Sequence, residues 1–406
     1  MHIRKVTSIG RSLLAACSLA GPLSLLVFTL AASHELGGFQ QTTSLTIPQA
    51  SIKHVVVHHQ PGRFCGWPAN NGVWIWGDEI LTGFVYGYFK SDEQSHSIDR
   101  SRPQASVLAR SLDGGETWTI EDPDHFVLDG GKPTPSPGDI QFGHPDFAMR
   151  VGNHTLIGNH DEDGQFFLSY DRGKRWQGPF LFPSFGLPMT SRTSYIVEGP
   201  TSCLILLSAK QPGVQGANYQ DRAFAVRTTD AGKSYRKLGW LAGDSTDARS
   251  VMPDTVKLSE GRYLTALRRK TATPSGIRNW IDIYGSDDGG ATWAFRSSPV
   301  QGLEHNGNPP SLCRLKDGRL ALAYGDRTPP YSIKATISAD EGRTWSPPIV
   351  LRDDGRNWDI GYTRTVQRRD GKLVTIYYFT TGKLPEMHIA ATIWQAPDPV
   401  PSASRP

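Results

Sequence analysis

The stretch Ser111-Leu112-Asp113-Gly114-Gly115-Glu116-Thr117-Trp118 combines Ser or Thr, Asp two residues later, Gly after two more and an aromatic residue three further on. The same pattern returns at Ser169–Trp176, Thr228–Tyr235, Ser286–Trp293 and Ser338–Trp345. The steps between the first residues are 58, 59, 58 and 52 residues. A period of this size predicts a repeat architecture in which each unit is one propeller blade.

The residue types of this motif fit a hairpin turn. Asp and Ser side chains cap backbone N–H groups locally, Gly adopts positive φ, and the aromatic residue packs beneath the next strand. A calcium loop beginning at Asp287 would require Glu eleven residues later, where the chain has Ser298. A catalytic role for the five Asp residues is also excluded, because one chain rarely repeats the same chemistry five times. We therefore interpret the motif as a structural staple.

Composition limits the classes of partner. The 406 residues contain 42 Gly and 29 Pro, which suits many short strands joined by turns. The net charge is +4, but Arg4, Lys5 and Arg11 account for three of these charges. A nearly neutral body argues against a nucleic-acid partner. Beyond the N-terminal region, Cys65, Cys203 and Cys313 are widely separated, so we expect no disulfide framework, metal site or cofactor.

The first 33 residues have the pattern of an export signal. Basic residues precede an apolar run from Leu13 to Ala32, and Ala31-Ala32-Ser33 would allow cleavage before His34. A lipoprotein box at Leu14–Cys17 and an uncleaved anchor are the alternatives. We therefore expect a secreted or periplasmic protein without stable membrane insertion after cleavage. Residues 34–51 would form a linker and residues 397–406 a tail.

Two segments near the ends of the chain predict how the ring closes. Ile52–His59 has the character of a strand but belongs to no repeat, and His388–Trp394 resembles the strand before each motif but has no motif after it. The N-terminal strand would therefore complete the last blade. Because residues 52–394 hold about six periods, we predict an all-β, six-bladed propeller over residues 52–396, as a monomer.

A second repeated unit precedes each motif and predicts the innermost strand of each blade. The units begin at Trp67-Pro68, Pro145-Asp146, Arg192-Thr193, Pro253-Asp254, Pro310-Ser311 and Gly361-Tyr362. Their starts would meet on one face around the axis, where propellers place binding sites. Polar and aromatic residues predicted at this mouth include Arg63, Trp67, Asn70, His144, Asp146, Arg192, Asp254, Arg268, Arg327, Asp359, Tyr362 and Arg364.

The many arginines at this mouth allow two interpretations. Arg presents a planar fork that suits a carboxylate, so the cluster could hold an anionic ligand. Alternatively, the Arg and Asp side chains could pair with each other as struts between blades.

With its five Asp motifs, the chain resembles the sialidase superfamily, in its branch of bacterial BNR-repeat proteins, over about residues 52–394. The resemblance implies a six-bladed propeller in which three arginines hold a sugar carboxylate. It also implies a Tyr nucleophile activated by a Glu, and an Asp that acts as acid and base. By position, Arg63 and Arg268 correspond to two of the arginines, and Tyr362 corresponds to the nucleophile.

The chain departs from this family pattern at several positions. Pro330 and Tyr331 stand where the third arginine is expected, and Arg327 is the nearest substitute. The activating Glu should fall near Met252, where Asp254 is the closest carboxylate. Tyr378 replaces the Glu that usually orients the first arginine. Asp92 and Asp99 lie in the region expected for the acid/base, but neither is a clear match.

These residues support three functional hypotheses. The first is an exo-acting glycosidase for sialic acid or a related carboxylated sugar, in which Tyr362 attacks the anomeric carbon, Asp254 takes its proton, and Arg63 and Arg268 hold the carboxylate. The second is a uronate-directed lyase or rhamnosidase-like propeller, with His144 or Tyr362 as acid/base. The third is a non-catalytic glycan-binding propeller that uses Trp67, Trp74 and Tyr331 as platforms.

Overall fold

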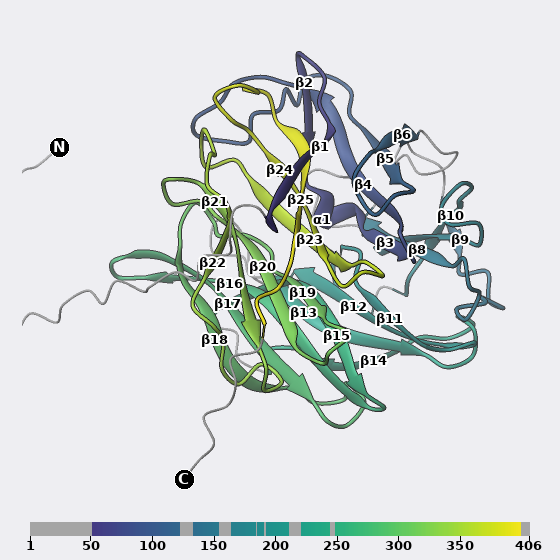
Figure 1. Cartoon of the computed structure of the whole chain (residues 1–406). Helices are drawn as coiled ribbons and strands as arrows, with labels where there is room; N and C mark the ends of the chain where they lie inside the picture. The colour runs from purple at the N-terminus through teal and green to yellow at the C-terminus, as the bar shows by residue number, and fades with distance from the viewer. Residues whose placement is uncertain are drawn as a thin grey trace, which may run out of the picture. The chain divides into compact units, whose positions relative to one another are not determined.

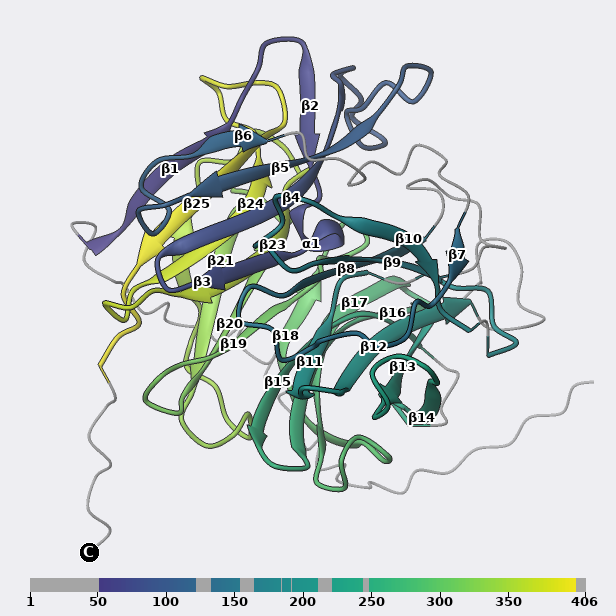
Figure 2. The same ribbon diagram turned by 90° about the vertical axis from the view of Figure 1, so that its right-hand side faces the viewer.

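The computed structural model describes residues 51–121, 133–153, 164–183, 185–190, 192–210, 221–243 and 248–398. The predicted signal segment, nearly all of the linker and most of the tail lie outside these residues. Within them, six small sheets form the blades of a β-propeller, as predicted; their strands pair antiparallel except for β7, which pairs parallel with β10 (Figures 1 and 2). No helix of the described part is long and apolar enough to cross a membrane.

The first three blades follow the chain in order. Blade 1 contains β2 (Arg63–Gly66), β3 (Val73–Trp76), β4 (Glu79–Tyr88), β5 (Ala105–Ser111) and β6 (Thr119–Glu121), and the short helix α1 (Pro68–Asn71) separates β2 from β3. Blade 2 contains β7 (Thr134–Pro135), β8 (Ala148–Asn153), β9 (Gly164–Ser169) and β10 (Gln177–Leu181). Blade 3 contains β11 (Tyr195–Gly199), β12 (Ser202–Lys210), β13 (Asp221–Thr228) and β14 (Arg236–Trp240).

The remaining blades complete the ring. Blade 4 contains β15 (Arg249–Ser259), β16 (Arg262–Thr273), β17 (Gly276–Ser286) and β18 (Ala294–Leu303). Blade 5 contains β19 (Ser311–Arg314), β20 (Leu320–Asp326), β21 (Ser332–Ser338) and β22 (Ile349–Arg352). Blade 6 contains β23 (Gly361–Gln367), β24 (Leu373–Phe379), β25 (His388–Trp394) and β1 (Lys53–His58).

The closure of the ring agrees with the sequence prediction. β1 pairs antiparallel with β25, with Lys53 opposite Ile393 and Val56 opposite Ala390. The N-terminal strand is therefore the outermost strand of the last blade (Figure 1). Because β1 covers the edge of β25, it shields backbone groups that would otherwise be open to pairing with another chain.

Each Asp motif forms the turn between the last two strands of its blade in chain order. In the first, the Asp113 carboxylate accepts hydrogen bonds from the backbone N–H groups of Glu116 and Thr117, while the Ser111 hydroxyl accepts one from Gly115. The Trp118 indole donates to the Gly115 carbonyl at 3.0 Å. Burial would raise the pKa of Asp113, but its hydrogen bonds from Thr117, Ser111 and Glu116 hold it at about 2. The motif is a structural staple, as predicted.

The core is divided among the seams between the blades. Residues of successive blades form six buried clusters, one at each seam, because alternate residues of a strand point to opposite faces of its sheet. At the seam of blades 1 and 2, for example, Trp74 and Leu81 pack against Phe167 and Trp176. A smaller cluster of Ala69, Val251, Met252 and Tyr362 lies where inner segments of blades 1, 4 and 6 meet.

Blade 2 differs from its prediction. Pro145-Asp146 was expected to begin an inner strand at the mouth, but β8 begins at Ala148, opposite Ser169, the first residue of the second Asp motif. The carboxylate of Asp146 pairs with Arg172 of that motif at 2.6 Å, and the ring of His144 packs edge-on against Tyr170. The placement of His144 and Asp146 at the mouth is therefore wrong, because this Pro-Asp pair belongs to a turn on the face that carries the Asp motifs.

Candidate active site

The candidate site is built around a strained corner at the start of β23. Tyr362 has φ of 53°, in the left-handed region that side chains other than Gly rarely adopt. The strand pairing of β23 with β24 shifts between Gly361 and Arg364, so Tyr362 stands out of the regular ladder. The buried Asn308 holds this corner, since its side-chain oxygen accepts the Tyr362 N–H at 2.8 Å and its amide donates to the Ile360 carbonyl at 3.1 Å.

Met252 occupies the corresponding corner of blade 4. It also has positive φ, 56°, and the pairing of β15 with β16 shifts between Val251 and Asp254. Met252 packs with Ala69 in the same central cluster as Tyr362. The position at which the resemblance implies an activating Glu is thus filled by a thioether, which can neither take a proton nor carry a charge.

Two buried arginines lie against Tyr362 instead. Arg268, from β16, donates to the Tyr362 hydroxyl at 3.4 Å and to the Asn306 carbonyl. The guanidinium carbon of Arg327, from the segment after β20, lies 5.8 Å from the centre of the Tyr362 ring. These arginines are only 6% and 2% exposed, so their charges act on the phenol with little screening by water.

The charges around Tyr362 change its acidity. Burial alone would raise the pKa of the phenol, but Arg268, Arg327 and Arg192 hold it below its ordinary value. Arg192 itself donates to the Asn70 side chain at 2.9 Å and to the Thr190 carbonyl. The site therefore favours a negative charge, on the tyrosine or on a bound ligand.

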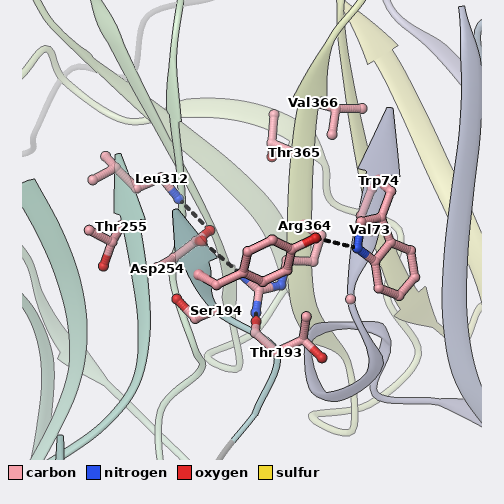
Figure 3. Close-up of a pocket in the computed structure, with 12 residues that line it drawn as sticks. Val73, Trp74, Thr193, Ser194, Asp254, Thr255, Leu312, Arg364, Thr365 and Val366 are labelled. Carbon is pink, nitrogen blue, oxygen red and sulfur yellow. Dashed lines mark hydrogen bonds and ion pairs between the residues drawn. The ribbon is translucent and has the colours of Figure 1, made fainter. Parts of the chain in front are cut away.

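Asp254, on β15, and Arg364, on β23, form a strut between blades 4 and 6. The carboxylate of Asp254 pairs with Arg364 at 2.7 Å and accepts the Leu312 N–H at 2.9 Å (Figure 3). Arg364 also donates to the carbonyls of Ala69 and Thr193. The predicted hydrogen bond between Asp254 and Tyr362 is wrong: Asp254 binds Arg364 and Leu312, whereas the Tyr362 hydroxyl is bonded to Arg268. Arg364 likewise joins blades rather than facing Tyr362.

The strut lines a cavity of about 270 Å³ along the inner strands (Figure 3). Its walls come from blades 1, 3, 4, 5 and 6 and include Val73, Thr255 and Val366. Trp74, one of the predicted sugar platforms, lines this cavity and donates from its indole to the Tyr195 hydroxyl at 3.1 Å. Trp74 is thus part of the inner wall of the propeller.

Arg63 and Trp67 also differ from their predicted environments. The guanidinium of Arg63 stacks on the rings of Tyr86 and Tyr88, at 4.1 and 4.0 Å, within blade 1. Its partners are therefore those of a packing residue, and the structure does not group it with Arg268 and Arg327. Trp67 is 6% exposed and packs 4.8 Å from Phe64, so it does not form an open platform.

The two aspartates predicted for acid/base work lie in the loop between β4 and β5. The carboxylate of Asp92 caps the backbone N–H groups of Gln94 and Ser95 at 2.8 and 2.9 Å, and Asp99 accepts hydrogen bonds from Ser101. Asp92 also lines a cavity of about 390 Å³ between this loop and Trp358. Tyr331, the third predicted sugar platform, lines the same cavity.

The same loop supplies a histidine that the sequence reasoning missed. The Nδ1 atom of His96 lies 2.5 Å from the buried carboxylate of Asp359, which also accepts the Tyr378 hydroxyl at 2.5 Å. Tyr378 in turn accepts a hydrogen bond from Arg327 at 2.9 Å. A histidine four residues after Asp92 was the available signal, but the period of the repeat does not determine the path of this loop.

No described group of three or more His, Cys, Asp and Glu side chains is arranged to hold a metal ion. The described reactive and charged side chains of the site are Tyr362, its neighbouring arginines and the His96–Asp359 pair. Together these combine an acidified phenol, a surplus of buried positive charge and an oriented imidazole.

Comparison with solved structures identifies the fold with that of sialidase-like propellers. A Dyadobacter fermentans protein of unknown function aligns with a TM-score of 0.63 at 22% identity, covering 84% of this chain and 98% of that one. An α-L-arabinofuranosidase of Fusarium graminearum with arabinobiose aligns with a TM-score of 0.55 at 12% identity, over 84% and 94% of the two chains. A sialidase of Streptococcus pneumoniae gives 0.51 at 10% identity, over 84% and 70%.

The family follows from the sequence itself. The family model described as a BNR repeat-like domain matches residues 155–375, more than half of the chain. The chain therefore belongs to the BNR repeat-like family, as the repeated Asp motifs indicated. No curated protein matches the sequence closely enough to add to this assignment.

Proposed function

We propose that this protein is a carbohydrate-active enzyme that cleaves a glycosidic bond beside a carboxylated sugar, with Tyr362 as the reacting side chain. The observation that carries the proposal is the strained corner that places the Tyr362 hydroxyl against Arg268 and close to Arg327. Strained backbone is found preferentially at functional sites. Support from relatives is at the level of the fold, which an arabinofuranosidase and a sialidase share.

Hydrolysis is the reaction that this geometry supports best. The Tyr362 phenolate would attack the anomeric carbon while the bond to the leaving sugar breaks, and water would then hydrolyse the bond between the sugar and the tyrosine. The arginines that lower the pKa of Tyr362 would stabilise the phenolate without a neighbouring Glu. The summed charge of Arg268, Arg327 and Arg192 would attract the sugar carboxylate and stabilise charge that develops during the reaction.

Eliminative cleavage of a uronate is the second candidate, and the residue at position 252 favours it. With Met252 in place of a carboxylate, the site has a phenolate base but not the tyrosine–glutamate pair that the sialidase resemblance implies. In that reaction Tyr362 would remove the proton next to the carboxylate, a carbon–carbon double bond would form as the bond to the leaving oxygen breaks, and Tyr362 would give the proton to that oxygen.

A substrate panel distinguishes these reactions. Purified protein would be incubated with sialosides and with ulvan-like and gum-like polysaccharides, and both reducing ends and ultraviolet absorbance would be measured. New reducing ends without absorbance indicate hydrolysis, whereas absorbance from an unsaturated uronate indicates elimination. Binding of a glycan by a protein that cleaves no member of the panel would contradict the proposal and favour the glycan-binding alternative.

Tyr362→Phe tests the assigned residue. Loss of one hydroxyl should lower turnover by roughly 10⁴-fold or more while leaving the fold and substrate binding nearly intact. Tyr170→Phe is the matched control, because Tyr170 belongs to the second Asp motif and contacts His144. Near-normal turnover by the Tyr362→Phe variant would show that the reacting group lies elsewhere.

A further inference from the structure

We infer that His96 is the proton donor to the leaving-group sugar and that Asp359 positions it, an inference that rests on the proposed function. The sugar released by the reaction would lie in the cavity of about 390 Å³ between the β4–β5 loop and Trp358. In this assignment the site has two reacting groups, the hydroxyl of Tyr362 and the imidazole of His96.

The contacts of His96 orient one ring nitrogen and leave the other for chemistry. Its Nδ1 atom is held by Asp359, whose second oxygen accepts the Ser97 N–H at 3.0 Å. The His96 side chain is 24% exposed, whereas that of Asp359 is 1% exposed. An imidazole fixed at Nδ1 by a buried carboxylate presents its Nε2 atom in a defined direction, as in acid/base histidines generally.

The surroundings of His96 connect it with the cavity at Trp358 and with Tyr362. Its ring packs 5.1 Å from Trp67 and 5.6 Å from Trp358, and the indole of Trp358 donates to the Glu93 carbonyl at 2.9 Å. Trp358 and Ser97, the residue after His96, both line the cavity. On the other side, hydrogen bonds lead from Asp359 through Tyr378 to Arg327, which lies beside Tyr362.

The proton balance of hydrolysis is complete with these two groups. As the Tyr362 oxygen bonds to the anomeric carbon, the bond to the leaving oxygen breaks and His96 gives its Nε2 proton to that oxygen. In the second step His96 takes a proton from water, the water oxygen bonds to the anomeric carbon, and Tyr362 leaves as phenolate. The enzyme returns to its starting state, and one water molecule has been consumed.

The contrast with the Asp254–Arg364 strut argues against a purely structural role for His96. Arg364 is bound to a carboxylate and two carbonyls, so it ties three segments together. Within the described residues, His96 has one hydrogen-bonded ring nitrogen and packs against Trp358, which lines the cavity.

Leaving-group dependence tests the role of His96 directly. The sugar would be the one that the substrate panel shows to be cleaved. Wild type, His96→Asn and His54→Asn would then be compared on an oligosaccharide and on the aryl glycoside of that sugar. His96→Asn should lose about 10²–10⁴-fold on the oligosaccharide, whose leaving oxygen needs a proton, and less than about tenfold on the aryl glycoside. His54, an exposed residue of β1, serves as the control.

Each outcome supports or overturns the assignment. Equal losses on both substrates, or no loss on either, would overturn the role of His96. An inactive Tyr362→Phe variant beside a fully active His96→Asn variant would retain the proposed function and reject this inference. Wild-type protein that cleaves neither substrate would reject the proposed function itself.

An independent readout remains if the His96 variant fails to fold or the wild type is inactive. Wild-type protein with ¹⁵N-labelled histidine side chains would be titrated with free N-acetylneuraminate and with glucuronate, at constant pH. A shift of the His96 Nε2 signal without a shift of the His54 signal would support a sugar site at His96. An unchanged His96 signal with both sugars would overturn it.

Discussion

At the scale of single residues, the central result is that Tyr362 is paired with positive charge. Its hydroxyl contacts Arg268, and Met252 stands where a carboxylate was expected. A Tyr–Glu pair would activate the phenol by accepting its proton, whereas two buried arginines stabilise the phenolate itself. Arginines therefore take the place of the Glu in favouring the ionised form of the tyrosine.

The Asp254–Arg364 pair yields a prediction about stability. Its side chains are 17% and 11% exposed, and removing one member of a buried pair leaves an uncompensated charge. Arg364→Met should therefore lower the free energy of unfolding by about 3 kcal/mol or more. Denaturant unfolding measures this change, and the double variant Arg364→Met with Asp254→Leu should recover most of it. Unchanged stability with weakened substrate binding would instead identify Arg364 as a ligand clamp.

At the scale of elements, the Asp motifs differ at a position where the backbone requires positive φ. The fourth residue of the motif is Gly114 or Gly289 in two blades, with φ of 73° and 74°, but Ala231 in blade 3, with φ of 60°. A residue with a Cβ atom is strained in this conformation, whereas Gly is not. The structural staple is therefore not equally relaxed in all blades.

Exchanging these residues tests that interpretation. Ala231→Gly should raise the free energy of unfolding by up to about 1 kcal/mol, because it relieves the left-handed backbone. Gly289→Ala is the reciprocal variant and should lower the free energy of unfolding by a similar amount. An added Cβ would meet no clash, because its nearest neighbour would be a side-chain nitrogen of Arg227 at 3.4 Å, so the strained backbone alone sets the effect. Thermal unfolding measures both variants. A shift of stability in the same direction for Ala231→Gly and Gly289→Ala would contradict the prediction.

The positions of some site residues along their strands could be predicted from the sequence, and those of others could not. The period of the Asp motifs and the repeated strand before them placed Tyr362 at the start of an inner strand, where the structure has it. The same reasoning misplaced His144, because the Pro145-Asp146 pair looks like Pro253-Asp254 but forms a turn on the opposite face. His96 was missed because it lies on a loop fixed by Asp359, a contact across 263 residues.

At the scale of the whole molecule, ring closure places a buried histidine in the last blade. His388 lies on β25, next to the closing strand β1, and is fully buried. Burial, with Arg352 and His59 nearby, lowers the pKa of His388 to about 4 from its ordinary 6.5. The folded protein therefore resists protonation at a pH at which the unfolded chain accepts it.

This difference predicts a loss of stability in mild acid. Since the unfolded chain binds more protons between pH 6.5 and about 4, the free energy of unfolding should fall through that range, by about 3 kcal/mol from His388 alone. His388→Phe should remove this part of the pH dependence. Denaturant unfolding at several pH values measures the slope, and an identical slope in the wild type and the variant would contradict the prediction.

The whole fold was more predictable than its chemistry. Five Asp motifs, together with two unpartnered end strands, were sufficient for six blades and for the pairing of β1 with β25. Which charges meet at the mouth depends on side chains from different blades, such as Arg268 and Tyr362, separated by 94 residues. A local sequence pattern contains no information about such contacts beyond placing both residues on the same face.

The ionisation of Tyr362 tests the central claim most directly. Tyrosine ring carbons would be labelled with ¹³C and titrated by NMR, and the Tyr362 signal would be assigned from its absence in Tyr362→Phe. The account predicts that Tyr362 ionises below the ordinary tyrosine pKa of 10, and that Arg268→Met raises its pKa because a buried positive charge is lost. A Tyr362 that ionises at or above 10 in the wild type, or whose pKa is unchanged in Arg268→Met, would contradict the account.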